Sequence, residues 1–284
     1  MRDKFLGVLL LVVLGLVGCG TPSGPSEPQR PVEVSQSVGN APVVHIDTPL
    51  PLAEASSELI VRGDGPALTS GAPALLALTA YDGTTGDLLP DRGHGESRTI
   101  IFSEEEVGEE IYSRLLGVPE GSRVLVMQPV TGEEGDHMLV LVIDVMHTQA
   151  QGEARELPED FPDVEVADDD DLGPQISLPE DDPPDELLVA PLIQGSGPQV
   201  GPAQDVTLQY SAVVWPGGEV YDSTWADGQV PRTIAIDDAF PGLRDGLLDR
   251  AVGSRMVLII PPELATGTNT LVFVVDILAA NDPN

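Results

Sequence analysis

Apolar and polar residues alternate between Val206 and Val214, in the sequence VTLQYSAVV. A period of two is typical of a β-strand that buries one face, so we expect a half-buried strand here. A second alternation, at Phe273, Val275 and Ile277, is interrupted by further apolar residues. That pattern predicts a central strand that is covered on much of both faces.

Between these two strands, four apolar residues recur at the spacing of a helix: Phe240, Leu243, Leu247 and Leu248. Gly253 follows where the connection after the helix has to end. One short helix among several strands predicts a curved antiparallel sheet that is wrapped around that helix. The expected fold class is therefore α+β.

The chain also repeats itself at a constant offset of 132 residues. This offset pairs GDGP at 63–66 with GSGP at 195–198, GSR at 121–123 with GSR at 253–255, and LVLVIDV at 139–145 with LVFVVDI at 271–277. Several landmarks at one offset indicate a duplicated domain. We therefore expect two domains of the same fold, at residues 46–147 and 187–284.

The two copies differ in their aromatic and acidic residues. The second copy has Tyr210, Tyr221, Asp222, Phe240 and Phe273 where the first has Leu78, Leu89, Pro90, Gly108 and Leu141. The first copy thus keeps the glycines and aliphatic residues that build a fold, but it lacks the side chains that would build a pocket. We interpret it as a degenerate copy with a structural or partner-binding role.

Residues 1–18 have the pattern of a signal peptide. A basic start is followed by a short apolar run and by small residues directly before Cys19. This pattern resembles a bacterial lipoprotein signal, in which Cys19 becomes the lipidated first residue; an uncleaved N-terminal helix is the alternative. Because Cys19 is the only cysteine, it cannot form an internal disulfide. We expect an extracytoplasmic protein that is anchored to the cell membrane by lipid on Cys19.

Two further segments have the composition of linkers. Residues 19–45 are rich in Pro, Ser and Gly without an apolar period, which predicts a disordered tether. Residues 148–186 are dense in Asp and Glu and predict an acidic linker between the two copies. Short alternations at 164–166 and 175–178 could pair within it as a small hairpin.

The run of aspartates in the acidic linker also suggests a calcium site. Asp168, Asp170 and Gly173 fall at the first, third and sixth positions of an EF-hand loop. Position twelve is Pro179, so the bidentate Glu is missing, and no helical pattern flanks the loop. A solvated acidic linker is therefore the favoured interpretation.

Charge narrows the classes of function. The formal net charge is −34, which disfavours a surface that binds phosphate, and we expect no nucleic-acid partner. The histidines show no spacing typical of metal ligands: His45, His94, His137 and His147. There is also no phosphate-binding loop and no nucleophile elbow, so we expect no metal and no cofactor. An isomerase or a binding protein fits these constraints.

The second copy carries a series of motifs in a fixed order: VTLQYSAVVWPGGEVYDS (206–223), GLRDGLL (242–248), VGSRMVLIIPPELATG (252–267) and TLVFVVDIL (270–278). This series resembles the FK506-binding-protein family of peptidyl-prolyl cis-trans isomerases. The resemblance implies that residues 187–284 form an isomerase domain. Such a domain needs no nucleophile, because an apolar cup that strips water from the amide favours its twisted state.

The resemblance places the cup at seven residues: Tyr210, Tyr221, Asp222, Phe240, Leu243, Thr266 and Phe273. It implies a hydrogen bond from Tyr210 to Asp222. Leu243 replaces the usual Trp, and Thr266 replaces a Tyr whose hydroxyl usually reaches the substrate carbonyl. The loop after Pro262 is also short. We therefore expect a weakened activity that belongs to the second copy only.

These features together predict a peptidyl-prolyl isomerase that helps exported proteins through slow prolyl steps at the cell surface. Its expected partners are prolyl-containing segments of exported proteins. The alternative is a non-catalytic surface lipoprotein that binds peptide segments or a protein partner. Catalysis and binding use the same pocket walls, so the sequence leaves both functions open.

Overall fold

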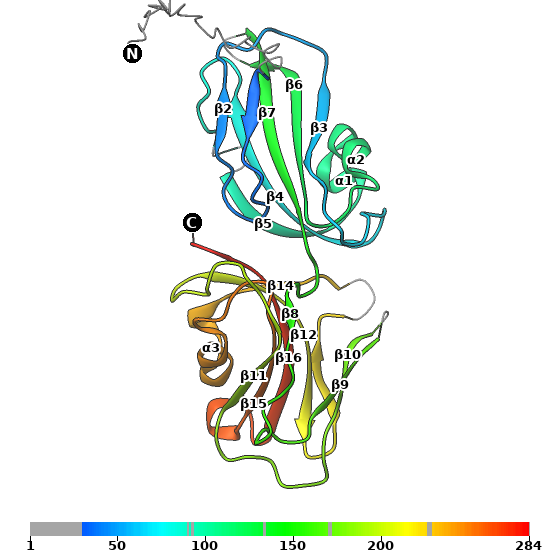
Figure 1. Cartoon of the computed structure of the whole chain (residues 1–284), viewed down its shortest axis with the longest axis vertical. Coiled ribbons are helices and arrows are strands. Elements are labelled where there is room, and N and C mark those ends of the chain that lie inside the picture. Colours follow the sequence, from blue (N-terminus) through cyan, green and yellow to red (C-terminus); the bar gives the residue numbers. More distant parts are fainter. Residues whose placement is uncertain are drawn as a thin grey trace, which may run out of the picture. The chain divides into compact units, whose positions relative to one another are not determined.

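The computed structural model describes residues 30–89, 91, 94–132, 135–169, 172–225 and 229–283. Within these residues the chain forms two larger antiparallel sheets, each with helical segments on one face (Figure 1). We call residues 32–146 the first repeat and residues 164–278 the second repeat, because the offset of 132 residues relates them. The sheet-rich α+β architecture agrees with the expected fold class.

The elements of the first repeat follow one another as β1 (Val32–Val34), β2 (Val44–Ile46), β3 (Ser56–Val61), β4 (Pro73–Asp82), β5 (His94–Ile101), α1 (Glu104–Val107), α2 (Glu109–Leu115), β6 (Ser122–Gly132) and β7 (Gly135–Met146). The strand order in its five-stranded sheet is β3-β6-β7-β4-β5. β1 and β2 pair separately as a two-stranded sheet.

The chain continues through β8 (Glu153–Ala154), β9 (Glu165–Asp169), β10 (Gly173–Ser177), β11 (Leu188–Gln194), β12 (Asp205–Trp215), β13 (Glu219–Ser223), β14 (Arg232–Ala235), the 3₁₀ turn η2 (Ile236–Asp238), α3 (Pro241–Leu247), β15 (Arg255–Ile260), the 3₁₀ turn η3 (Pro262–Leu264) and β16 (Thr270–Asn281). The order in the seven-stranded sheet is β13-β12-β16-β15-β11-β8, and β14 also pairs with β12. β9 and β10 form a separate hairpin.

The two larger sheets share one topology. The offset carries β3, β6, β7, β4 and β5 onto β11, β15, β16, β12 and β14, in the same order across the sheet, and α2 onto α3. The register also agrees, because Arg123 lies opposite Asp144 as Arg255 lies opposite Asp276. The sequence repeat is therefore also a repeat of strand topology.

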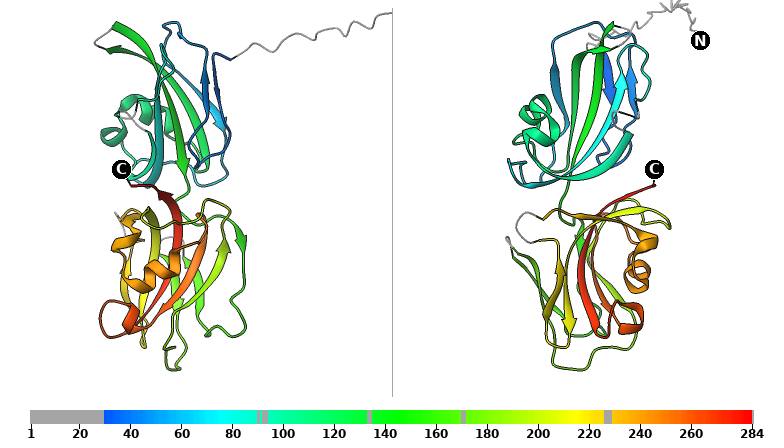
Figure 2. Two further views of the ribbon diagram at one scale, coloured as in Figure 1. Left: turned by 90° about the vertical axis from the view of Figure 1, so that its left-hand side faces the viewer. Right: turned by 180° about the vertical axis from the view of Figure 1, so that it is seen from behind.

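The β1–β2 and β9–β10 hairpins belong to this repeat. Val32 packs with Val140 and Val142, and the corresponding Val164 packs with Val272 and Val274. In the second repeat the hairpin covers the face of the sheet that is opposite α3, as both views in Figure 2 show. Each repeat therefore has a sheet that is covered on one face by helix and on the other by a hairpin.

These hairpins correct two predictions. The expected tether (residues 19–45) is wrong from Val32 onward, because β1 buries Val32 against the sheet; residues 19–29 and Cys19 lie outside the described residues. The acidic linker contains the suggested hairpin, β9–β10, but this hairpin is packed rather than solvated. It also makes β12 buried on both faces between 206 and 213, so the half-buried strand predicted there is wrong.

A buried ion pair joins neighbouring strands in each sheet. The guanidinium of Arg255 on β15 donates to both carboxylate oxygens of Asp276 on β16, at 2.6 and 2.8 Å. In the second repeat the β9–β10 hairpin adds to this ion pair, because the Asp168 carboxylate on β9 accepts a hydrogen bond from Arg255. Asp168 is therefore not a free linker aspartate. Arg123 and Asp144 form the same two bonds in the first repeat, at 2.6 Å each. Removing one partner of such a pair leaves a buried charge uncompensated.

Glycines let α3 approach the second sheet closely. A Cβ on Gly242 would lie 2.2 Å from a side-chain carbon of Ile260, and one on Gly246 would lie 2.3 Å from Leu258. Only glycine fits at such distances, and the close approach places Leu243 of the first turn against the sheet. Within the described part of the chain, no helix is long and apolar enough to cross a bilayer.

We predict that Val164→Asp destabilises the protein strongly, because it puts a carboxylate into the apolar layer between the hairpin and the sheet. The free energy of unfolding should fall by about 3 kcal/mol or more. Chemical denaturation of the full chain measures this. Glu165→Gln is the matched control, since Glu165 is the next residue and is exposed. A Val164→Asp variant as stable as Glu165→Gln would show that the hairpin is not part of the core.

Candidate functional site

The candidate site is a cavity of about 460 Å³ on the helix side of the second sheet. All seven residues predicted for the cup line it: Tyr210, Tyr221, Asp222, Phe240, Leu243, Thr266 and Phe273. The cavity is also lined by residues that the sequence did not single out: Leu208, Arg232, Thr233, Ile234, Ala235, Asp238 and Ala239. The structure thus brings the predicted residues together from β12, β13, α3, β16 and the loop after η3.

Phe273 is the centre of an aromatic cluster. Its ring centroid lies 5.6 Å from that of Tyr210, 6.0 Å from Phe240 and 6.4 Å from Tyr221, with tilted or edge-on ring planes. These are ordinary geometries for attractive aromatic pairs. Phe273 and Tyr210 are buried, whereas 45% of Tyr221 remains exposed. The cluster therefore runs from the core of the second repeat to the mouth of the cavity.

Local structure explains how these rings meet. Tyr210 and Phe273 are on the paired central strands β12 and β16, whose register places Tyr210 opposite Val275. Because side chains two residues apart on a strand share a face, Phe273 and Tyr210 lie on the same side of the sheet. Phe240 directly precedes α3, and Pro241 begins the helix. The close packing of α3 then holds Phe240 and Leu243 at the cavity.

A polar cluster occupies one wall. The Tyr210 hydroxyl donates to Asp222 at 2.7 Å, which confirms the hydrogen bond expected from the sequence. Arg232 Nη1 donates to the same hydroxyl at 2.6 Å and to Asp222 at 3.0 Å. The guanidinium also lies 5.6 Å from the Tyr210 ring centroid, within the range of a cation–π contact. The three side chains therefore hold each other in place.

These contacts shift two pKa values. Burial and the Asp222 carboxylate both raise the pKa of the Tyr210 hydroxyl, so it remains protonated. Burial alone would raise the pKa of Asp222, but hydrogen bonds from Tyr210 and Arg232 outweigh this effect and hold that pKa below its ordinary value. Asp222 is therefore an ionised acceptor. It orients the Tyr210 hydroxyl and does not act as a proton donor near neutral pH.

Sequence reasoning missed Arg232, although a signal was present. At the offset of 132 residues Arg232 stands opposite Ile100, just as Asp222 stands opposite Pro90. A cation and an anion thus appear together in the second repeat only. Two opposite charges at positions where the first repeat has uncharged residues indicate an ion pair.

The mouth of the cavity carries two hydroxyl groups. The Tyr221 oxygen on β13 and the Thr266 oxygen in the loop after η3 are 2.7 Å apart, and either group can be the donor. Both side chains line the cavity, and both are exposed. This bond closes the gap between β13 and that short loop.

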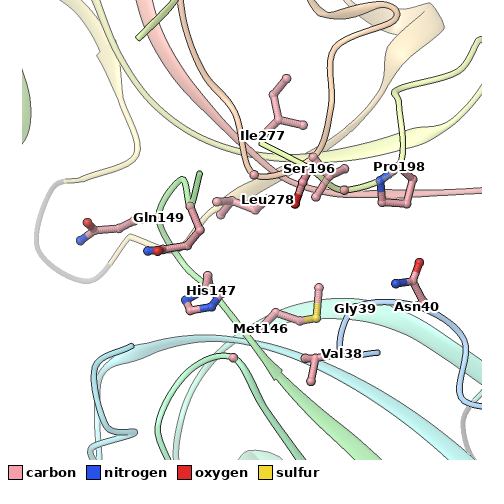
Figure 3. Close-up of a pocket in the computed structure, with 15 residues that line it drawn as sticks. Val38, Gly39, Asn40, Met146, His147, Gln149, Ser196, Pro198, Ile277 and Leu278 are labelled. Atoms are coloured by element: carbon pink, nitrogen blue, oxygen red, sulfur yellow. The ribbon is translucent and has the colours of Figure 1, made fainter. Parts of the chain in front are cut away.

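A second cavity, of about 260 Å³, has a different character. Figure 3 shows residues that line it, among them Met146 at the end of β7, His147 and Gln149 just after it, and Ile277 and Leu278 on β16. Among the described residues that line it, none is Phe, Tyr, Trp, Asp or Glu. It contains none of the residues predicted for the cup. The aromatic cavity is therefore the candidate site.

The first repeat lacks the cup at the corresponding place. Phe102 is fully buried there and stacks on Tyr112, with ring centroids 5.0 Å apart. Leu141 stands in the position of Phe273 and packs in the same cluster. Glu110 and Arg114 replace the two helix glycines and form an ion pair at 2.9 Å. Core side chains occupy the space between helix and sheet, so the first repeat keeps the scaffold without the aromatic site.

Comparison with known proteins identifies the family that this chain resembles. The model of the family described as FKBP-type peptidyl-prolyl cis-trans isomerase matches residues 197–277. A protein of Corynebacterium glutamicum described as a probable FK506-binding protein is 34% identical over 116 residues, which cover 38% of this chain and 98% of that protein. An FK506-binding protein of Streptomyces anulatus is 30% identical over 118 residues, covering 37% and 95%.

Among solved structures, FkpA from Escherichia coli is 28% identical, with a TM-score of 0.32. The match covers 34% of this chain and 48% of that chain, so it spans about half of the FkpA structure. The family assignment rests on the sequence matches, and the range matched by the family model, 197–277, contains all residues that line the aromatic cavity.

The lowered pKa of Asp222 predicts a pH dependence of stability. A carboxyl whose pKa is lower in the folded state stabilises the protein above its unfolded pKa, about 3.9, and loses this contribution as the pH falls through the folded value. The difference in melting temperature between the wild type and Asp222→Asn should therefore be largest above about pH 4 and shrink on acidification. Thermal unfolding between neutral and acidic pH measures it. A difference that grows as the pH falls would contradict the assigned pKa direction.

Proposed function

The chain belongs to the FKBP-type peptidyl-prolyl cis-trans isomerase family, and we propose that the cavity around Phe273 is its catalytic centre. The observation that carries this proposal is the cluster of three rings around Phe273, beside a fully hydrogen-bonded Tyr210–Asp222 pair. It offers an apolar floor with one polar wall. A prolyl ring fits such a site, because it is apolar and its flanking amides are polar.

The mechanism needs no covalent step. Rotation about an X-Pro bond faces a barrier of about 18–20 kcal/mol, because twisting removes the amide resonance. The planar amide is more dipolar than the twisted amide, so a cavity that removes water destabilises the planar form more. Tyr210, Phe240 and Phe273 supply this apolar environment. Asp222 and Arg232 form hydrogen bonds with the Tyr210 hydroxyl, so that the polar wall of the cavity stays fixed while the X-Pro bond rotates.

We assign the activity to the second repeat alone. Leu78, Leu89 and Leu141 stand in the first repeat where the second has Tyr210, Tyr221 and Phe273. The Phe102–Tyr112 stack also fills the space between helix and sheet there. The two repeats are then two domains of one fold, a catalytic one and a degenerate one that serves as a scaffold or as a surface for a partner.

The substrates are prolyl-containing segments of exported proteins, and the site works outside the cytoplasm. This part of the proposal rests on the pattern of residues 1–19, with Cys19 as the point of lipid attachment. Those residues lie outside the described part of the chain. An anchored isomerase meets chains that have just crossed the membrane, while their prolyl bonds still equilibrate over tens of seconds.

Phe273→Leu should lower kcat/KM for a prolyl peptide about tenfold or more, because it removes the central ring and copies the residue of the first repeat. Asp222→Ala should also lower it, because Tyr210 loses its acceptor and the wall is no longer fixed. A protease-coupled assay with the full chain and a prolyl tetrapeptide 4-nitroanilide measures both.

Leu141→Met is the matched control, because Leu141 is the first-repeat counterpart of Phe273 and a volume-conserving change costs little stability. It should leave kcat/KM unchanged. Full activity of Phe273→Leu together with a loss in Leu141→Met would place catalysis in the first repeat. A wild-type chain that binds the peptide without isomerising it would instead favour the non-catalytic binding protein.

Cys19→Ser should release the protein from the membrane while the folded part remains intact, because the substitution removes the only thiol that could carry lipid. Fractionation of cells that express the full-length chain measures the distribution. A variant that stays in the membrane fraction would contradict lipid attachment at Cys19. The isomerase assay on the released protein checks that folding is unchanged.

A further inference from the structure

A third cavity, of about 290 Å³, lies where the β9–β10 hairpin meets the outer strands of the second sheet. The hairpin contributes Leu172 and Ile176, β12 contributes Val213, and the β13 segment contributes Val220 and Trp225. Among the described residues that line it, none carries a charge. It shares no described residue with the aromatic cavity. We call this separate, mostly apolar cavity the hairpin groove.

The first repeat closes the corresponding place. Pro42 and Thr79 line a cavity of only about 10 Å³. The offset of 132 residues carries these two residues onto Pro174 and Ser211, which line the hairpin groove. The two repeats thus share the position of this cavity and differ in whether it is open.

The side chains at this position differ in two places. Tyr81 stands where the second repeat has Val213, and its hydroxyl donates to the carbonyl of Pro42, at 3.3 Å, so the side chain reaches from β4 to the segment between β1 and β2. The shorter Val213 cannot form such a bond. Asn40 likewise stands where the second repeat has Leu172. The second repeat therefore has an open, apolar groove where the first has a tyrosine bonded across the gap.

Large apolar side chains of the hairpin groove are exposed to solvent. The exposed fractions of Leu172 and Val220 are 59% and 71%. The Trp225 ring lies directly against the hairpin, because a Cβ on Gly173 would lie 2.3 Å from it. Exposed apolar side chains that gather around a cavity indicate a binding surface, whereas single ones do not.

The surroundings of the groove define its occupant. β13 is an edge strand, and its outer backbone groups pair with no further strand in the described part of the chain, so an extended segment can add beside it. Glu219 on β13 is exposed, and so is Asp169 on β9, which lies opposite Gly173 in the hairpin. A second copy of this chain, with its formal net charge of −34, is repelled by these acids. A segment that carries Lys or Arg is complementary to them.

We propose that the hairpin groove binds an extended segment of another polypeptide, in which apolar residues are flanked by Lys or Arg. The segment lies along β13, and its apolar side chains pack on Val220 and Trp225, while its basic residues lie near Glu219 and Asp169. Alternate side chains of an extended segment share one face, so every second residue can enter the groove. This binding needs no proline, and it does not rest on the isomerase activity of the aromatic cavity.

The test is an NMR titration of the full chain, carrying ¹⁵N-labelled tryptophan, with the blocked peptide Lys-Thr-Leu-Val-Val-Lys-Thr. The chain has two tryptophans, and Trp225→Phe assigns their indole N–H peaks. The Trp225 peak should shift on titration. The Trp215 peak should stay in place, because Trp215 is buried and its Nε1 donates to the carbonyl of Asp181. The same peptide with Glu in place of Lys should bind about tenfold more weakly or less.

Two variants copy the first repeat. Val213→Tyr should fill the groove and abolish the shift of the Trp225 peak. Leu172→Asn should weaken binding about fivefold or more, because it removes an apolar wall, and it should leave the melting temperature unchanged, because Leu172 is exposed. Leu88→Asn is the matched control, since it removes an exposed leucine from the first repeat and should leave the Kd unchanged.

The shift of the Trp225 peak should persist in Phe273→Leu, and its loss there would place the peptide in the aromatic cavity and overturn the proposal. A Trp225 peak that the lysine peptide does not move would also overturn it. So would equal binding of the two peptides, or equal binding by Leu172→Asn and the wild type. A Trp225 peak that moves on dilution of the protein alone would show that a second copy covers the groove, which contradicts the proposed occupant.

Discussion

Each of the two larger sheets is apolar on both faces, and the rest of the structure depends on covering both. A sheet of this kind is unstable in water unless a second layer covers each side. Helix α3 covers one face of the second sheet, and the β9–β10 hairpin covers the other through residues such as Val164. The folded unit is therefore longer than residues 197–277, which match the isomerase family.

The same constraint gives the site its rigidity. Tyr210 and Phe273 are on the central strands β12 and β16, and the second face of these strands is packed under the hairpin. The buried Arg255–Asp276 pair joins β15 to β16, and Asp168 from the hairpin adds to it. A catalytic surface that acts by excluding water needs walls that do not move, and strands buried on both faces provide them.

The two repeats show how little of a scaffold has to change for a site to exist. Both keep the strand order and the buried arginine–aspartate pair. Within the described residues, only the second has the three rings around Phe273, two glycines that bring the helix close, and the charged pair Asp222–Arg232. The difference lies in side chains that line one cavity, while the core aliphatic residues that define the fold are shared.

The sequence alone determined the central strands, the helix after Phe240 and the offset of the repeat, because these depend on local periodicity and self-similarity. It also named seven residues that the structure brings into one cavity. The sequence suggested a hairpin within 164–178 but placed it in a solvated linker, and it gave no hairpin for residues 32–46. Only the tertiary structure decided that both hairpins cover a sheet, since such short strands carry too weak a period to separate them from linkers. The Tyr221–Thr266 bond likewise depends on where a strand and a loop meet after folding, and no local pattern encodes that distance.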